Sequence, residues 1–476
     1  MNFLNKRNFL LWILVIALAG GLIRFVNITF ASLWADELYS VLSSHPKNSL
    51  YTILYMQRTY QPPLYFLVLW SWLKLFAYNE FYARLLSVLG GITAIVVSGF
   101  LGKKIKDEKM GFLMALLVAF NPTQIMYSLE ARFYIFVYIF ATLSLLIYWH
   151  ILQQPKSKNY LIYVLKACID ATLCYLHHFG IIFVLSQFLF DIYLYFKEND
   201  RKEFVRKFGG YIITAILYSP WFFWGLLKGL STSQFWLKEI NILKYIQFNF
   251  NYSHLLNYLF YGLIIYYIIK IFRKSFYKYH IFLVICLMVI IIPLLYSILR
   301  IPILVDRYSM VMAPALYILV ILGFIEVTDT LKTWKPYCSK IATGIFLIIL
   351  LSPGIYMSFI HKEKLEKQPW REMGQWLKNQ EDYEKTKIYS LGILLNKRFT
   401  IDFYLNKNKE AVHLTNMKVG EDPKMYLVES NSVWQINDTI LSKVRKQYSI
   451  KQIPFNKDHA EFGNIYVCEK KPLAQN

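Results

Sequence analysis

The stretch Leu10 to Phe25, LLWILVIALAGGLIRF, is a hydrophobic run whose only charged residue is Arg24, and Trp34-Ala35-Asp36-Glu37 follows it closely. Similar runs recur as far as residue 358, and each approaches the roughly 20 residues with which a helix crosses a bilayer. The chain of 476 residues is 56% hydrophobic and only 17% charged. No small-residue cleavage site follows the first run, so it is not a cleaved signal peptide. The sequence predicts a mainly α, polytopic transmembrane helical bundle.

Eleven membrane spans are expected. They fall at Leu10–Phe25 and at about 83–101, 110–121, 133–150, 160–176, 180–196, 208–224, 255–271, 281–299, 308–326 and 341–358. The segment from Pro62 to Lys74 is too short for a span, and we expect an outer interfacial helix there, with proline at its start.

The distribution of basic residues predicts the orientation. The net charge of +22 would suggest nucleic acid binding in a soluble protein, but membrane proteins concentrate Lys and Arg in cytoplasmic loops. Basic loops at 103–109, 156–158, 197–207, 270–278 and 332–340 all fall on one side of the membrane if the N-terminus is cytoplasmic. Eleven spans then place the C-terminus outside, in a multi-pass protein of a bacterial inner membrane.

The composition changes after residue 358. We expect domains at 1–358, which is transmembrane, and at 359–476, a small extracytoplasmic α/β domain. Its helix is predicted at 369–377, and its strands at 387–390, 425–428 and 464–468. The five cysteines show no metal-binding spacing and no disulfide framework.

Asp36 and Glu37 are the first candidates for chemistry. A carboxylate in a shielded pocket can remove a proton from a hydroxyl group as a general base. The structural alternative is an acid that caps the helix after it, since Asp favours that position. Charges beside a membrane tend to mark function, so we favour the catalytic interpretation.

Polar residues also interrupt the apolar runs at two later outer turns. Glu130 and Arg132 lie in a predicted loop from Asn121 to Tyr134, where Arg can bind phosphate or anchor a helix end. His177 and His178 lie at a hinge between spans. Adjacent residues on a helix point in different directions, so hydrogen bonding to a substrate or head group is favoured over a shared metal ion.

The last outer turn runs from Arg300 to Tyr308. Arg300 and Arg307 are candidates for binding phosphate, and snorkelling at a helix end is the alternative. The outer face thus combines acids, cations and polar aromatics, whereas no nucleotide-binding motif occurs on the inner side. A substrate with a phosphate group and a very apolar body fits this arrangement.

In these motifs the chain resembles the GT-C glycosyltransferases that use polyprenyl-phosphate sugars, over about residues 1–360. Relatives of this kind include protein O-mannosyltransferases, lipid A aminoarabinose transferases and proteins similar to rhizobial lipopolysaccharide core transferases. The resemblance rests on an ordered set of short motifs: W-x-D-E at 34–37, Q-P-P-L-Y-F at 61–66, E-x-x-x-R-L-L-S at 80–87, N-P at 121–122, S-L-E-A-R-F-Y at 128–134, Y-L-H-H-F-G at 175–180 and D-R-Y at 306–308.

The resemblance implies roles for the matching residues. Asp36 matches the catalytic base, and Glu37 its neighbour. The implied substrate cavity comprises Trp34, Gln61, Tyr65, Glu130, Tyr134, His177, His178 and Tyr308. Arg132, Arg307 and Arg300 are the implied donor-phosphate ligands. Many relatives have His or Lys where this chain has Gln61, so the arginines must supply more of the positive charge.

The expected reaction is inverting transfer of a sugar from a polyprenyl-phosphate donor to a cell-envelope acceptor outside the cytoplasm. The acceptor is a glycolipid, lipopolysaccharide, polysaccharide or protein. No cofactor is required by the sequence, although some relatives bind a divalent cation near the acids. The alternatives are a transporter or flippase for lipid-linked sugars and a lipid-linked glycan polymerase or ligase.

Overall fold

The computed structural model describes residues 7–57, 61–154, 160–227, 241–250, 253–274, 277–360, 362, 368–390, 400–406, 409–429, 438–455 and 463–472. The basic loop at 156–158 therefore lies outside the described residues. The chain divides into two compact units. The first comprises Met1–Phe25, Ser49–Val68 and Arg84–Ser358, and the second comprises Val26–Asn48, Leu69–Ala83 and Phe359–Asn476.

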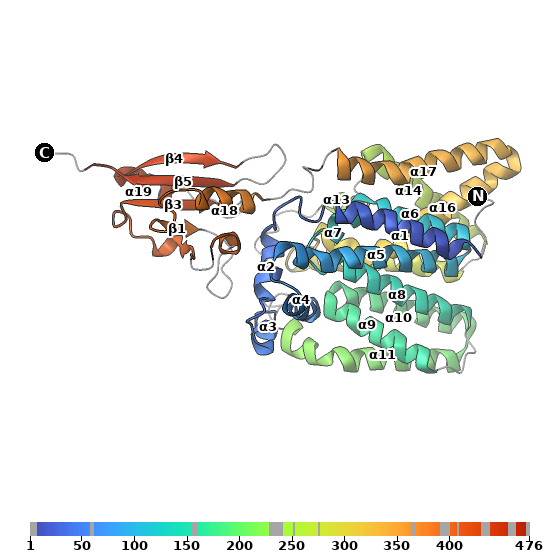
Figure 1. Cartoon of the computed structure of the whole chain (residues 1–476). Helices are drawn as coiled ribbons and strands as arrows, with labels where there is room; N and C mark the ends of the chain where they lie inside the picture. Colours follow the sequence, from blue (N-terminus) through green and yellow to red (C-terminus); the bar gives the residue numbers. More distant parts are fainter. Residues whose placement is uncertain are drawn as a thin grey trace. The chain divides into compact units, whose positions relative to one another are not determined.

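Helices dominate the chain as far as residue 359 (Figure 1). In order they are α1 (Phe9–Phe25), α2 (Ala35–Ser43), α3 (Leu50–Gln57), α4 (Leu64–Leu75), α5 (Glu80–Ile105), α6 (Glu108–Phe120), α7 (Pro122–Ser128), α8 (Tyr134–Gln153), α9 (Tyr160–Leu176), α10 (Phe179–Glu198), α11 (Arg201–Trp221), η1 (Phe222–Leu226), α13 (Ile242–Gln247), α14 (His254–Lys274), η2 (Tyr277–Tyr279), α15 (His280–Leu299), η3 (Asp306–Met312), α16 (Ala313–Trp334) and α17 (Pro336–Phe359).

Every segment expected to span the membrane overlaps a helix. Within the described residues, seven helices are long and apolar enough to cross a bilayer, or eight if α6 and α7 form one bent span. The protein is therefore a multi-pass membrane protein with seven to eight spans by this measure. The other expected spans coincide with α1 and α9, of 17 residues each, and with α11, which begins with several charged residues. The predicted interfacial segment forms the short helix α4.

Close helix packing in the first unit depends on glycine. A Cβ atom at Gly111 of α6 would lie 2.5 Å from the carbonyl oxygen of Gly99 on α5, and one at Gly99 would lie 2.6 Å from Ile13 on α1. Small residues allow membrane helices to approach in this way because lipid provides little hydrophobic drive for their association. A larger residue at Gly111 would force α5 and α6 apart, because the atom that it meets belongs to the backbone, whereas at Gly99 the end of the Ile13 side chain would have to move.

A buried arginine supports the bend between α6 and α7. Pro122 has no N–H group, so it leaves the carbonyl group of Val118 without its usual helical donor. Arg24, which is 0% exposed, donates from Nη2 to Val118 at 3.0 Å and from Nη1 to the Ala119 carbonyl group at 2.9 Å. The freed carbonyl groups are thereby satisfied inside the bundle, as the membrane interior requires. The 60° bend directs the chain into the turn before α8.

The C-terminal part of the second unit contains a mixed β-sheet. Its elements are α18 (Trp370–Lys378), β1 (Lys387–Ser390), η5 (Thr400–Tyr404), β2 (Val412–His413), η6 (Leu414–Asn416), β3 (Lys424–Glu429), α19 (Asp438–Gln447), β4 (Tyr448–Pro454) and β5 (Asn464–Lys470). The strand order is β2-β1-β3-β5-β4. Strand β1 runs parallel to β2 and β3, and β5 runs antiparallel to β3 and β4.

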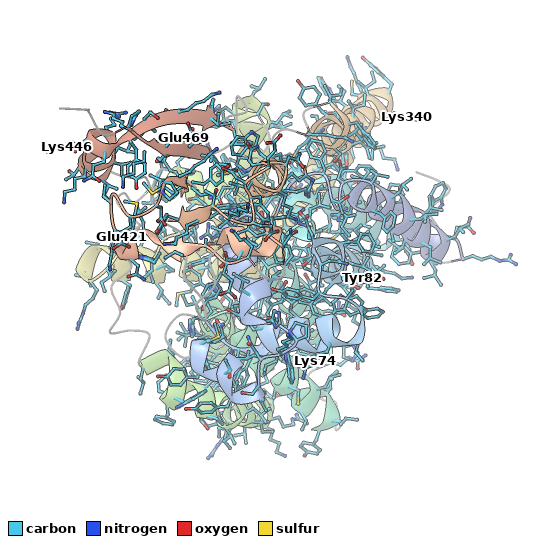
Figure 2. The ribbon with its side chains drawn as sticks, turned by 60° about the vertical axis from the view of Figure 1, so that its left-hand side comes forward. Lys74, Tyr82, Lys340, Glu421, Lys446 and Glu469 are labelled. Carbon is cyan, nitrogen blue, oxygen red and sulfur yellow. The ribbon has the colours of Figure 1, made fainter. Side chains whose placement is uncertain are left out.

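The predicted α/β domain is present, with the expected helix at α18 and the expected strands at β1, β3 and β5. Its core packs Met425 and Leu427 of β3 against Val444 of α19. Charged side chains such as Glu421 and Glu469 lie on the outside of this domain (Figure 2). Strand β4 was not expected, because it is an edge strand whose residues are mostly exposed and whose apolar alternation breaks after Lys451.

Candidate active site

The two adjacent acids lie in the first turn of α2, in the second unit. Glu37 is 0% exposed, and its Oε2 atom accepts the backbone N–H of Trp34 at 3.2 Å. An acid at the third helical position that binds this N–H group is one half of a capping box. The capping role considered for Asp36 is therefore filled by Glu37. Asp36 precedes Glu37 in the helix, and its side chain is half-buried.

The expected loop from Asn121 to Tyr134, in the first unit, contains helix α7. Asn121 caps this helix by accepting the backbone N–H of Gln124 at 3.0 Å, and Pro122 occupies its first position, where no N–H partner is needed. A tight turn then joins α7 to α8, in which the N–H of Arg132 donates to the Glu130 carbonyl oxygen at 2.7 Å. Cap, proline and turn together place Glu130 and Arg132 at the mouth of α8.

Arg132 is almost completely buried, with 2% of its surface exposed. Its Nη2 atom donates to Oε1 of Gln61 at 3.5 Å. The centre of its guanidinium group lies 4.8 Å from the Phe133 ring and 5.7 Å from the Tyr134 ring. Aromatic faces attract cations, so these contacts orient the guanidinium group. A basic residue at position 61 would have added positive charge. Gln61 adds none, and its side chain orients Arg132 instead.

An aromatic cluster surrounds this arginine. The His177 ring centroid lies 4.5 Å from that of Tyr308 and 5.2 Å from that of Phe133, which in turn lies 6.2 Å from Tyr65. Tyr134 is 6.5 Å from His177 and is 1% exposed. The structure therefore brings candidates from four separated segments of the sequence into one cluster in the first unit.

Both histidines are neutral at physiological pH. Burial lowers the pKa of His177 well below its usual value, and electrostatic interaction with His178 and with the charges of Arg132 and Arg307 lowers it further. Burial also lowers the pKa of His178, to about 4. His178 Nδ1 lies 3.3 Å from the hydroxyl group of Tyr218. The histidines can thus donate or accept hydrogen bonds, but Arg132 and Arg307 carry the charge of the cluster.

The two arginines of the last outer turn have different surroundings. Arg307 is the second residue of η3 and is close enough to His177 to affect its pKa. Arg300 is exposed at the end of α15, where its backbone N–H donates to the Tyr296 carbonyl group. Arg307 therefore belongs with the aromatic cluster. The described contacts of Arg300 are those of a residue at a helix end.

A hydrogen-bond network that the sequence did not reveal holds η3 in place. The side-chain amide of Asn249 donates to the Ser309 hydroxyl oxygen at 2.9 Å, and the backbone carbonyl oxygen of Asn249 accepts from the Tyr317 hydroxyl group at 2.7 Å. Tyr317 also accepts from Gln124 of α7 at 3.1 Å. The network therefore couples the Arg307 segment to α7. Its only sequence signal is the presence of amides in apolar surroundings.

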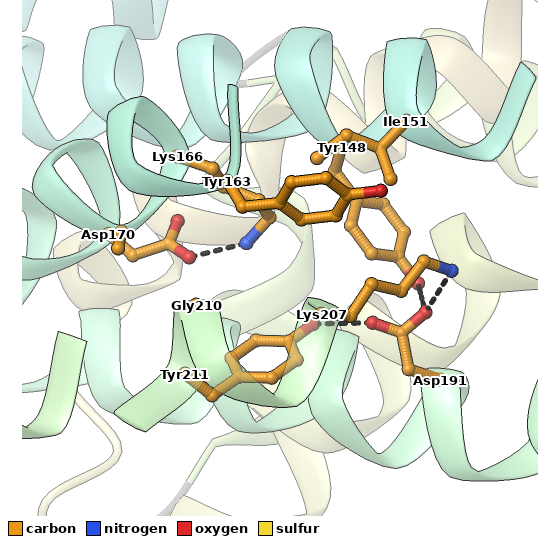
Figure 3. A pocket seen from close by; sticks show the side chains of 10 residues that line it. Tyr148, Ile151, Tyr163, Lys166, Asp170, Asp191, Lys207, Gly210 and Tyr211 are labelled. Atoms are coloured by element: carbon orange, nitrogen blue, oxygen red, sulfur yellow. Dashed lines mark hydrogen bonds and ion pairs between the residues drawn. The ribbon is translucent and has the colours of Figure 1, made fainter. Parts of the chain in front are cut away.

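A second buried cluster lies between α8, α9, α10 and α11, which pack side by side (Figure 1). Asp191 accepts hydrogen bonds from Tyr148 at 2.8 Å and Tyr211 at 2.7 Å, and forms an ion pair with Lys207 at 2.9 Å (Figure 3). The cavity that these residues help to line holds about 10 Å³, too little for a substrate.

The neighbouring pair Lys166 and Asp170 joins the same cluster, and Asp170 also accepts from Ser144 at 2.6 Å. The two lysines and two aspartates balance in charge, as buried ions require. We assign this cluster to helix packing. The spacing of Lys166 and Asp170 by one helical turn inside an apolar run was the signal for it in the sequence.

The described residues contain no group of three or more His, Cys, Asp and Glu side chains that could hold a metal ion.

Residues 60–224 match the protein family described as Dolichyl-phosphate-mannose-protein mannosyltransferase. The chain is similar to this family over that segment. No curated protein sequence matches the chain. The segment includes Gln61, Arg132 and both histidines of the cluster, so the family match covers most of the candidate residues of the first unit.

Solved structures with the same fold confirm the resemblance. Apo ArnT from Cupriavidus metallidurans matches with a TM-score of 0.59 and 12% identity, over 96% of this chain and 97% of that one. ArnT bound to undecaprenyl phosphate matches with a TM-score of 0.58 and 12% identity, over 97% and 98%. An archaeal oligosaccharyltransferase from Archaeoglobus fulgidus, in complex with an inhibitory peptide and a dolichol-phosphate, matches with a TM-score of 0.55 and 11% identity, over 99% and 76%. The expected enzyme class, a membrane glycosyltransferase of the GT-C type, is confirmed.

Proposed function

We propose that the enzyme transfers a sugar, with inversion, from a polyprenyl-phosphate donor to a hydroxyl group of a cell-envelope acceptor. The observation that carries this proposal is the buried, aromatic-lined Arg132 within the segment of the family match. The similar ArnT structure is bound to undecaprenyl phosphate, and the similar oligosaccharyltransferase to a dolichol-phosphate and a peptide. A phosphate on an apolar lipid is the ligand that such a site suits.

Arg132 and Arg307 are the proposed ligands of the donor phosphate. Polyprenyl phosphate leaves with a negative charge on the oxygen that had joined it to the sugar. A guanidinium group can donate two parallel hydrogen bonds to a phosphate and stabilises this charge as it develops. The neutral His177 contributes a hydrogen bond and ring packing, and Arg300 makes a smaller contribution from its exposed position.

Asp36 is the proposed general base. It accepts the proton of the acceptor hydroxyl group as the hydroxyl oxygen attacks the anomeric carbon and the bond from that carbon to the phosphate oxygen breaks. Glu37 is less suited to this role, because its carboxylate is buried against the start of α2. Trp34, Tyr65, Glu130, Tyr134, His178 and Tyr308 are the proposed lining of the substrate cavity.

The proposed topology has eleven spans, with α1, α9 and α11 added to the helices that satisfy the length and composition criteria. The N-terminus is then cytoplasmic and the C-terminal domain extracytoplasmic, in a bacterial inner membrane. The basic loops support this orientation through the positive-inside rule. The domains at 1–358 and 359–476 are proposed accordingly.

The test uses purified protein in nanodiscs with undecaprenyl-phosphate sugars and an envelope acceptor fraction. Asp36→Asn should reduce transfer by roughly 10²–10⁴-fold, the usual contribution of a general base, while binding of undecaprenyl phosphate is retained. Glu37→Gln should have the milder effect on turnover. Full transfer by both variants and by the double variant would refute the carboxylate mechanism. Movement of the donor across the membrane without its consumption would favour a flippase.

A further inference from the structure

The segment that leads into α2 is held by residues far along the chain, all within the second unit. The backbone N–H of Ala35 donates to Oε1 of Gln368 at 2.9 Å, and that of Leu33 donates to the hydroxyl oxygen of Tyr404 at 2.7 Å. The Ser32 hydroxyl group donates to the Gln368 carbonyl oxygen. The chain immediately before Asp36 is thus bonded to the region after residue 358.

These partners are themselves fixed. Gln368 is 3% exposed, and its Oε1 also accepts the indole N–H of Trp370 at 2.8 Å. The Tyr404 hydroxyl group donates to Oε1 of Glu80 at 3.4 Å. Arg371 forms an ion pair with the same carboxylate at 2.6 Å, and the neighbouring Ala31 carbonyl group accepts from Arg371 at 2.9 Å.

The contact with Glu80 affects the charge of Arg371. Partial burial lowers the pKa of Arg371, but its hydrogen bond and charge pairing with Glu80 outweigh burial and raise the pKa overall. The ion pair therefore holds a charged Arg371, and through it the Ala31 end of the segment.

The bond from Ala35 to Gln368 has a specific consequence for α2. The first N–H groups of a helix have no partner within the helix and are usually satisfied by a capping side chain. Trp34, the residue at the cap position, has no oxygen in its side chain. Gln368 supplies the missing acceptor to the residue directly before Asp36. Its position therefore sets the direction in which α2, and with it the Asp36 carboxylate, begins.

We propose that Gln368 and Tyr404 are positioning residues for Asp36, so that the C-terminal region completes the catalytic loop. This rests on the proposed role of Asp36 as general base. Small displacements of a reacting group reduce rates steeply, by up to roughly a hundredfold for 1 Å. Loss of the Gln368 acceptor should therefore reduce turnover and leave donor binding intact.

The test compares Gln368→Ala with Gln375→Ala, an exposed glutamine of α18 that serves as the matched control. Gln368→Ala should lower kcat by roughly ten- to a hundredfold with little change in the KM for the donor. Gln368→Glu should recover much of the loss, because a carboxylate oxygen can accept the same two N–H groups. Gln375→Ala should behave as the unmodified enzyme.

Tyr404→Phe provides a second variant that keeps the packed ring and removes only the hydroxyl group. It should lower kcat in the same way, which keeps the proposal testable if Gln368→Ala does not fold. Unchanged kcat in a folded Gln368→Ala and in Tyr404→Phe overturns the proposal.

The Asp36→Asn background separates this proposal from the function on which it rests. If Gln368 acts through Asp36, adding Gln368→Ala to Asp36→Asn should cause no further loss of kcat. A multiplicative further loss would show that Gln368 acts elsewhere. Full activity of Asp36→Asn alone would instead refute the role of Asp36.

Discussion

Replacement of Arg132 by alanine tests the central feature of the first unit. A hydrogen bond to a charged group contributes about 1.5–3 kcal/mol, and this guanidinium group, at 2% exposure, is shielded from competing water. Arg132→Ala should therefore lower kcat/KM for the lipid-phosphate sugar by roughly ten- to a hundredfold. Its bond to Gln61 is long, at 3.5 Å, so the loss of that bond adds little to the effect.

The assay measures initial rates over a range of donor concentrations in nanodiscs, together with the affinity for undecaprenyl phosphate alone. Arg132→Lys should recover only part of the loss, because lysine keeps the charge but lacks the planar pair of donors. Arg201→Ala, at an exposed arginine of α11, is the control for loss of a positive charge. A folded Arg132→Ala variant with unchanged donor kcat/KM and unchanged lipid-phosphate affinity would refute the assignment.

Three further predictions concern stability and topology. The pKa of His178 is about 4 in the folded protein, whereas an unfolded histidine takes up a proton below about pH 6.5. The folding stability present above about pH 6.5 should therefore be lost as the pH falls toward 4. In the His178→Gln variant the thermal unfolding midpoint should depend less on pH, and a pH profile identical to that of the unmodified protein would contradict this. Asp191→Asn leaves Lys207 buried without its counter-charge and should lower the free energy of unfolding by about 3–5 kcal/mol. Asp329→Asn, at an exposed acid, is the control and should change the free energy of unfolding very little. Equal effects of the two variants would argue against the packing role of the cluster. A reporter that is active only in the cytoplasm should be silent when fused after Asn476, and activity there would reverse the proposed orientation.

Helix positions were predictable because long apolar runs have few other stable structures in a membrane. Strands β1 and β3 were also predictable, since their buried residues form compact apolar runs between polar segments. Helix α7 was not, because Pro122 and the polar residues around it are equally typical of a loop. The candidate residues could be named individually from the motifs, but the contact between Arg132 and Gln61 depends on how distant helices pack.

The division of roles between Asp36 and Glu37 was likewise hidden. Either acid suits the start of a helix, and only the buried contact to Trp34 distinguishes them. The bond between Ala35 and Gln368 joins residues 333 positions apart, and no periodicity or spacing in the sequence could indicate it. Such contacts are properties of tertiary structure.

Arg24 also constrains the order in which the protein can be assembled. It lies in helix α1, yet its carbonyl partners lie 94 and 95 positions later in the chain. At a synthesis rate of about 5–20 residues per second, those partners emerge only after roughly 5–20 s. During that interval the charge must stay near water, because an isolated arginine is costly in the lipid interior. Helix α1 therefore reaches its final depth only when α6 arrives, and the two helices enter the membrane as one assembly step.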